Sequence, residues 1–111
     1  MPTYVVGDIH ITDPAVYQAH VPRAMATIAR FGGRIVAGGS RVDLLEGEPM
    51  PEQIFIIEFQ NAAAARRWYQ SDDYQEALKV RLSASHGRLL LIEGTEISTA
   101  VPLPGLDGAQ D

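Results

Sequence analysis

Apolar and polar residues follow one another along the chain in patterns that predict four strands separated by helices. Strand patterns lie at residues 3–11, 34–39, 54–59 and 88–93. A helical spacing of apolar residues begins after Asp13-Pro14 and runs to about residue 31, where Gly32-Gly33 ends it. Asn61 is placed to cap a helix to about residue 70, and Ser71 or Asp72 to cap another to about residue 84.

The order of these elements predicts an α+β fold. A βαββαβ order, with the second helical unit in one or two pieces, is typical of the ferredoxin-like arrangement, in which a four-stranded antiparallel sheet carries its helices on one face. We expect this domain to cover residues 1–97. Residues 98–111 are rich in proline and glycine and are expected to form a C-terminal tail.

The predicted strands carry apolar residues on both faces. A sheet whose helices cover only one side needs apolar residues on that side alone. Ile54 and Ile56 alternate with Phe55 and Ile57, and four apolar residues follow one another at 89–92. A face open to water should instead alternate with polar residues. We therefore expect a second copy of the chain to pack on the uncovered face, in a symmetric homodimer.

Composition narrows the function classes. The 111 residues carry a formal net charge of −5, which argues against a nucleic-acid binder, and they include no cysteine, which excludes disulfides and Cys-ligated metal centres. His10, His20 and His86 lack the spacing of a metal site. No apolar run approaches a membrane span and no signal peptide is evident, so we expect a cytoplasmic protein with no metal, organic cofactor or membrane partner.

Several segments together resemble a known family. They are DPAVY at 13–17, FGGRIVAGG at 31–39, LEGEPMP at 45–51, IIEF at 56–59 and ARRWYQSDDYQEALKVR at 65–81. Over roughly residues 3–95 the chain is similar to the DUF1330 family of the dimeric α/β-barrel superfamily. This resemblance implies a ferredoxin-like protomer that dimerises sheet to sheet. Relatives in the superfamily include cofactor-free monooxygenases, isomerases and haem-degrading enzymes, so the fold alone selects no reaction.

The chain departs from the family pattern at two positions. Ala37 and Gln53 stand where the family usually or often carries a basic residue. If those basic residues hold an anion in relatives, the resemblance implies a less charged ligand here.

Three titratable residues on the predicted helices stand out. Tyr17 and His20 are spaced i, i+3, so they are either a pocket-facing pair with His20 as acid or base, or a core tyrosine beside a solvated histidine. Arg81 follows Tyr74 by seven residues on an apolar helix face, where a cation needs a partner. That partner is a carboxylate of Glu58 or Glu93, a carbonyl at a helix end, or the carboxylate of a ligand.

The remaining candidates lie on the third strand and at the helix junction. Glu58 closes an apolar strand, where burial would make it a general base, or a salt bridge would make it structural. Trp68, Tyr69 and Tyr74 either line a pocket for a flat substrate or pack in the core.

These residues support two functions of different classes. The first is a small-molecule-binding protein that acts, without a cofactor, on a small aromatic or polyketide-like metabolite by proton transfer or oxygenation. In it His20 or Glu58 is the base, Arg81 stabilises negative charge, Tyr17 and Tyr74 donate hydrogen bonds, and Trp68 and Tyr69 help to line the pocket. The second is a non-catalytic dimeric binding or interaction module, which a filled core with Arg81 paired to Glu58 would favour.

Overall fold

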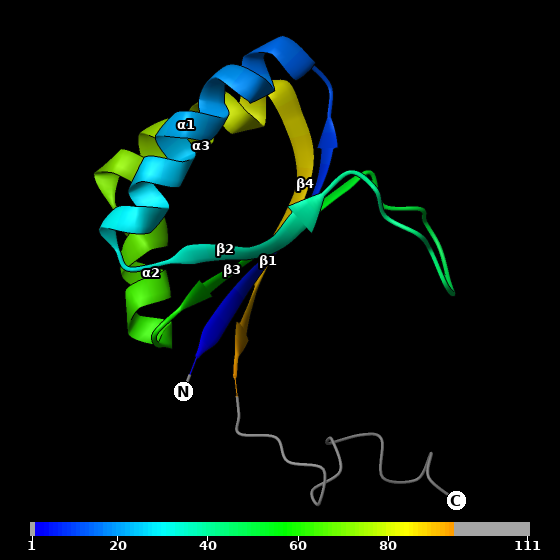
Figure 1. Ribbon diagram of the computed structural model, residues 1–111. Coiled ribbons are helices and arrows are strands. Elements are labelled where there is room, and N and C mark those ends of the chain that lie inside the picture. Colours follow the sequence, from blue (N-terminus) through cyan, green and yellow to red (C-terminus); the bar gives the residue numbers. More distant parts are fainter. Residues whose placement is uncertain (1, 95–111) are drawn as a thin grey trace, which may run out of the picture.

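The computed structural model describes residues 2–94 of the chain, and this range contains seven helices and strands (Figure 1). In chain order they are β1 (Thr3–Ile11), α1 (Pro14–Arg30), β2 (Arg34–Gly39), β3 (Gln53–Phe59), α2 (Ala62–Gln70), α3 (Asp72–Ala84) and β4 (Ser85–Glu93). The predicted tail at 98–111 lies outside the described residues. Within residues 2–94, no helix has both the length and the apolar character needed to cross a bilayer.

The four strands form one antiparallel sheet in the order β2-β3-β1-β4, with β3 and β1 in the middle. All three helices lie on one side of it, and α1 packs along α3 (Figure 1). This is the ferredoxin-like arrangement, with the second crossover divided into α2 and α3. The predicted fold class is confirmed.

β4 begins earlier than the sequence pattern predicts, at Ser85 rather than at Arg88. Ser85 follows the last residue of α3 directly and pairs with Ile11 of β1. Gly87 lies so close to β1 that a Cβ there would overlap the carbonyl oxygen of Asp8. Gly87 is therefore a point of close backbone approach inside the strand.

Side-chain caps start the three helices at residues that the sequence predicts. Asp13, Asn61 and Ser71 each accept a hydrogen bond from the backbone N–H three residues later, at 3.3, 2.8 and 3.1 Å. At the end of α1, Gly32 has a φ of 78° and turns the chain into β2. The positions at which the helices begin and end help to determine which of their side chains face the sheet.

Trp68 lies in the middle of the core between the helices and the sheet. It is 2% exposed, with its ring centroid 4.1 Å from that of Tyr74 and 5.4 Å from that of Phe59. Its indole N–H donates a 3.1 Å hydrogen bond to the hydroxyl of Thr27 on α1. Around it are buried Val5, Ile28, Ile57, Phe59, Ala64, Ala65, Tyr74 and Leu78.

The opposite face of the sheet has no helix over it (Figure 1), and its inner area is apolar. Leu90 and Ile92 of β4 are 44% and 51% exposed there. Ion pairs lie towards the two ends of this face, Arg88 with Asp8 at 3.6 Å and Arg34 with Glu58 at 2.9 Å. The apolar side chains of this open face are Tyr4, Val6, Ile54, Ile56, Leu90 and Ile92.

Thr27→Val should destabilise the fold, because the buried indole N–H of Trp68 then loses its acceptor. We expect a loss of about 1–3 kcal/mol in the free energy of unfolding, measured by urea denaturation. Thr27→Ser keeps the hydroxyl and is the matched control. Equal urea midpoints for the valine and serine variants would contradict the assigned role of this hydrogen bond.

Candidate functional site

Four polar or charged side chains from α1 and α3 meet in the interior of the helical layer. Tyr17 and His20 come from α1, and Tyr74 and Arg81 come from α3. All four are buried, with exposed fractions between 3% and 6%. We call them the Arg81 cluster. Their spacings of three residues on α1 and seven on α3 place each pair on one helix face, and the packing of α1 on α3 brings the two pairs together.

Arg81 is a buried cation without a counter-ion in the described part of the chain. Its Nε has no hydrogen-bond partner, and no carboxylate of residues 2–94 lies within 4 Å of its guanidinium nitrogens. The two protein carboxylates expected as partners are engaged elsewhere, Glu58 by Arg34 and Glu93 by Arg66. Burying an unpaired guanidinium costs several kcal/mol, and an anion placed beside it would offset that cost.

His20 is held neutral by its surroundings. Burial lowers its pKa, the nearby charge of Arg81 lowers it further, and the carbonyl of Ala77 partly opposes these effects. Its buried Nδ1 has no hydrogen-bond partner within the described residues. At neutral pH the imidazole therefore has a free lone pair with which to accept a proton.

The two tyrosines of the cluster are neutral hydrogen-bond donors. Burial raises the pKa of both Tyr17 and Tyr74, and the charge of Arg81 works against that rise. The Tyr17 ring lies 5.8 Å from that of His20, measured between ring centroids. Their hydroxyls can donate to an oxygen that becomes negative, next to the cation that stabilises it.

An apolar cavity of about 290 Å³ opens beside the cluster, between α1 and the β2–β3 side of the sheet. All four cluster residues and Trp68 line it, and Phe55 and Ile57 contribute from β3. We call it the α1-side cavity. Its size and apolar lining suit a small flat organic molecule, with the cluster providing the polar groups.

Phe55 lies in this cavity wall because of a glycine on the next strand. Gly7 is the cross-strand partner of Phe55, and a Cβ at Gly7 would overlap the Phe55 ring. The ring therefore lies flat over β1.

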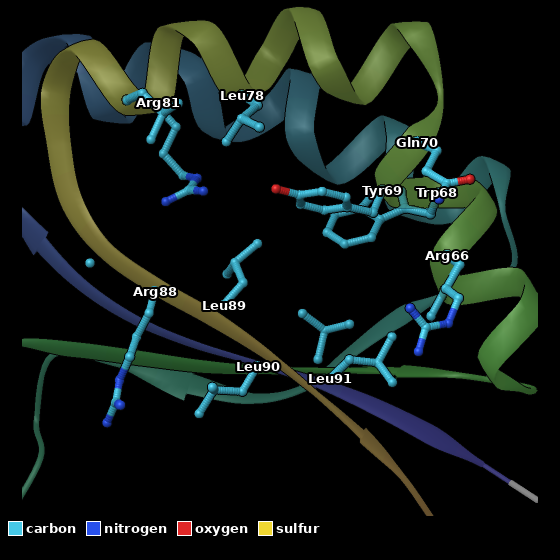
Figure 2. Close-up of a pocket in the computed structure, with 14 residues that line it drawn as sticks. Arg66, Trp68, Tyr69, Gln70, Leu78, Arg81, Arg88, Leu89, Leu90 and Leu91 are labelled. Atoms are coloured by element: carbon cyan, nitrogen blue, oxygen red, sulfur yellow. The ribbon is translucent and has the colours of Figure 1, made fainter.

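A second cavity, of about 360 Å³, lies on the other side of Arg81, between the helices and β4 (Figure 2). Leu89 and Leu91 extend into it from the sheet, and Tyr69 and Arg66 border it from α2 (Figure 2). We call it the β4-side cavity. Trp68 and Arg81 line both cavities, so one buried cation faces two separate spaces.

The structure brings together most of the residues that the sequence predicts for the site, but not all. Tyr17, His20, Tyr74, Arg81 and Trp68 line the α1-side cavity, and Tyr69, which is 42% exposed, borders the β4-side cavity. Glu58 is not with them. It lies on the open face of the sheet, where it accepts a 3.0 Å hydrogen bond from the Nε of Arg34 and forms an ion pair with that arginine at 2.9 Å. This is the structural alternative that the sequence left open.

Sequence reasoning missed Phe55 and Arg66 as lining residues. Phe55 has a signal in the strand alternation, because it shares the face of the buried Ile57. Arg66 has none, because only the packing of α2 near β4 places it at a cavity. Within residues 2–94, no three histidine, aspartate or glutamate side chains are grouped so that they could hold a metal ion together.

Solved structures with this fold include proteins from several bacteria. A protein of unknown function from Rhodopseudomonas palustris matches with a TM-score of 0.73 and 21% identity, over 86% of this chain and 84% of that one. SnoaB from Streptomyces nogalater, a cofactor-independent oxygenase, matches with a TM-score of 0.63 and 17% identity, over 88% and 97% of the two chains. A dimeric ferredoxin-like protein of unknown function from Jannaschia sp. CCS1 matches with a TM-score of 0.61 and 11% identity, over 86% and 100%.

At these identities the structural matches show a shared fold. No curated protein matches the sequence. The family model described as "Domain of unknown function (DUF1330)" matches residues 2–95, the range that contains both cavities and the Arg81 cluster. The chain belongs to the DUF1330 family.

Proposed function

We propose that the Arg81 cluster binds a small, mostly apolar organic compound that carries a negative charge or acquires one during a reaction. The observation that carries this proposal is the buried guanidinium without a counter-ion. A ligand carboxylate, phenolate or enolate would supply the missing charge, and the apolar α1-side cavity would hold its carbon skeleton. This is the class of small aromatic or polyketide-like metabolites.

The reaction that these groups suit is proton transfer without a cofactor. Neutral His20 takes a proton from an acidic C–H or phenolic O–H of the ligand and becomes imidazolium. The ligand becomes an enolate or phenolate whose oxygen is stabilised by Arg81 and by the hydroxyls of Tyr17 and Tyr74. Return of the proton to another carbon would complete an isomerisation.

Other outcomes start from the same anion, which can close a ring or react with O₂. SnoaB, a cofactor-independent oxygenase with this fold, supports such chemistry. Glu58 has no part in this proposal, because it pairs with Arg34 on the other face of the sheet.

The competing function, a non-catalytic dimeric binding module, would use the same cavity without a chemical step. Both functions include a homodimer formed through the open face. Its apolar side chains and the lack of a covering helix support this assembly, and the Jannaschia protein with this fold is dimeric.

Replacing Arg81 by methionine should remove the preference for anionic ligands. We expect the wild-type protein to bind 2-naphthoate at least about tenfold more tightly than the isosteric 2-naphthamide in calorimetric titrations. Arg81→Met should abolish that difference and leave the melting temperature equal or higher, because an unpaired buried charge is removed. Arg67→Met, at an exposed arginine of α2, is the matched control. Retention of the carboxylate preference in Arg81→Met would contradict the ligand role.

Proton transfer can be tested with 2-tetralone, a flat ketone with an acidic C–H. We expect the protein to accelerate hydrogen–deuterium exchange at that carbon, followed by NMR. The base must be neutral, and burial and Arg81 lower the pKa of His20, so the rate should stay on its plateau as the pH falls through about 6.5. It should decline only below the lowered pKa.

His20→Gln should abolish this acceleration, and His86→Gln, at an exposed histidine on β4, should retain it. Binding without any acceleration would favour the non-catalytic module. Equal rates in both variants would exclude His20 as the base.

If the homodimer forms through the open face, a charged residue in the middle of that face should dissociate it. Ile56 faces away from the helices on the inner strand β3, opposite Val6 of β1. Ile56→Glu should convert a dimer into a monomer in multi-angle light scattering at micromolar concentration, because two buried carboxylates would meet no partner. Met25→Glu, on the helical side, should leave the dimer intact. A monomeric wild-type protein at that concentration would contradict the assembly.

A further inference from the structure

The β4-side cavity runs along β4, because two of its lining residues lie near opposite ends of that strand. Arg81 is in the last turn of α3, and the hydroxyl of Ser85, the first residue of β4, donates a 2.6 Å hydrogen bond to the Arg81 carbonyl. Arg66 of α2 lies 3.9 Å from Glu93, the last residue of β4. Figure 2 likewise shows the two arginines on different sides of the space. The cavity therefore suits a long ligand better than a compact one.

The walls of this cavity are mainly aliphatic. Leu89 and Leu91 of β4 extend into the space from the sheet, and Leu78 borders it from α3 (Figure 2). Val5, the cross-strand partner of Leu91, also lines it. The α1-side cavity, in contrast, has four aromatic side chains in its lining: Tyr17, Phe55, Trp68 and Tyr74. Aliphatic walls along a strand suit an extended hydrocarbon chain.

The charged residues that line the β4-side cavity differ in what they already contact. Arg66 and Arg88 are exposed, and each has a carboxylate of this chain within 4 Å. Arg81 is 6% exposed and has no such carboxylate among residues 2–94. Figure 2 shows its guanidinium directed into the space, with the Tyr69 side chain reaching toward it from α2. A ligand in this cavity therefore needs one anionic group, at Arg81, and no charge elsewhere.

We propose that the β4-side cavity is a second ligand site, which binds a linear aliphatic carboxylate with its head group at Arg81 and its chain along β4. The proposal rests on the anion-binding role of Arg81 in the proposed function, but it assigns a different space and a different class of ligand. The hydroxyl of Tyr69 donates to the same carboxylate. Leu78, Leu89 and Leu91 contact the hydrocarbon chain.

Because the two sites share one cation, their ligands oppose each other. A carboxylate on either side of Arg81 neutralises the guanidinium and weakens its attraction for an anion on the other side. This coupling is reciprocal, so each ligand lowers the affinity of the other by the same factor. An aliphatic acid in the β4-side cavity would thus inhibit binding of an aromatic anion without entering the α1-side cavity.

Calorimetric titrations with octanoate test the class of ligand. We expect octanoate to bind at least about tenfold more tightly than octanamide, and Arg81→Met to abolish that difference. Binding should tighten by about tenfold for each two carbons added from butyrate to octanoate, because each buried methylene contributes to affinity. Arg67→Met is again the matched control. Equal affinities for octanoate and octanamide in the wild-type protein overturn the proposal.

A pair of variants that fill one cavity each tests the location. Of the two cavities, Leu91 lines only the β4-side cavity and Ile35 of β2 only the α1-side cavity. Leu91→Trp should weaken octanoate binding at least about tenfold and leave 2-naphthoate binding unchanged, and Ile35→Trp should do the reverse. If either tryptophan lowers the melting temperature, Leu91→Phe and Ile35→Phe repeat the comparison with a smaller ring.

Competition between the two ligands tests the shared cation. Saturating octanoate should raise the apparent dissociation constant of 2-naphthoate at least about fivefold in the wild-type protein. Independent binding of the two ligands overturns the shared role of Arg81.

The outcomes separate the second site from the proposed function. Octanoate that does not bind, or whose binding is lost in Ile35→Trp and kept in Leu91→Trp, overturns the second site. The proposed function then stands if 2-naphthoate keeps its Arg81-dependent advantage over 2-naphthamide. Loss of that advantage with octanoate binding intact overturns the proposed function at the α1-side cavity alone. Failure of both carboxylates to bind overturns both.

Discussion

The packing of Trp68 is the interaction on which the candidate site most depends. Its ring contacts Tyr74 of α3 and Phe59 of β3, and its N–H is bonded to Thr27 of α1. One side chain from α2 thus connects both other helices and the sheet. The distance between α1 and α3, and with it the meeting of their polar residues, follows from this central contact.

The main free-energy cost of this arrangement is the desolvation of the buried Arg81 guanidinium. An apolar residue of similar volume would pack at that position without a desolvation penalty, and the cluster would then be ordinary core. Instead the fold keeps a cation between two cavities and lowers the pKa of the neighbouring His20. Sites that bind or transform ligands commonly retain such unfavourable groups at the expense of stability.

Most of the fold could be predicted from the sequence, because its local signals agree with one another. Caps at Asp13, Asn61 and Ser71, and strand alternation around Phe55, depend on neighbours a few residues away. The beginning of β4 could not be predicted, because the role of Gly87 depends on the approach of β1, which is distant in sequence.

The candidate site could be predicted only in part, because local spacing identifies its residues but not their neighbours in space. Helical spacing identifies Tyr17 with His20, and Tyr74 with Arg81, as pairs, but it does not show that the pairs face each other. Glu58 illustrates the limit of that reasoning. Its strand position is evident in the sequence, whereas its face is opposite to the cavity, and its partner Arg34 is assigned only by the pairing of β2 with β3.

The contact between Gly7 and Phe55 makes the volume of the α1-side cavity depend on a residue of the sheet. The Phe55 ring forms part of the cavity wall and rests where Gly7 has no side chain. A methyl group at residue 7 would overlap the ring, so the ring would have to move and the wall of the cavity would change with it. The volume of the α1-side cavity can therefore change through a strand residue that does not line it, while the four residues of the Arg81 cluster on the helices stay as they are.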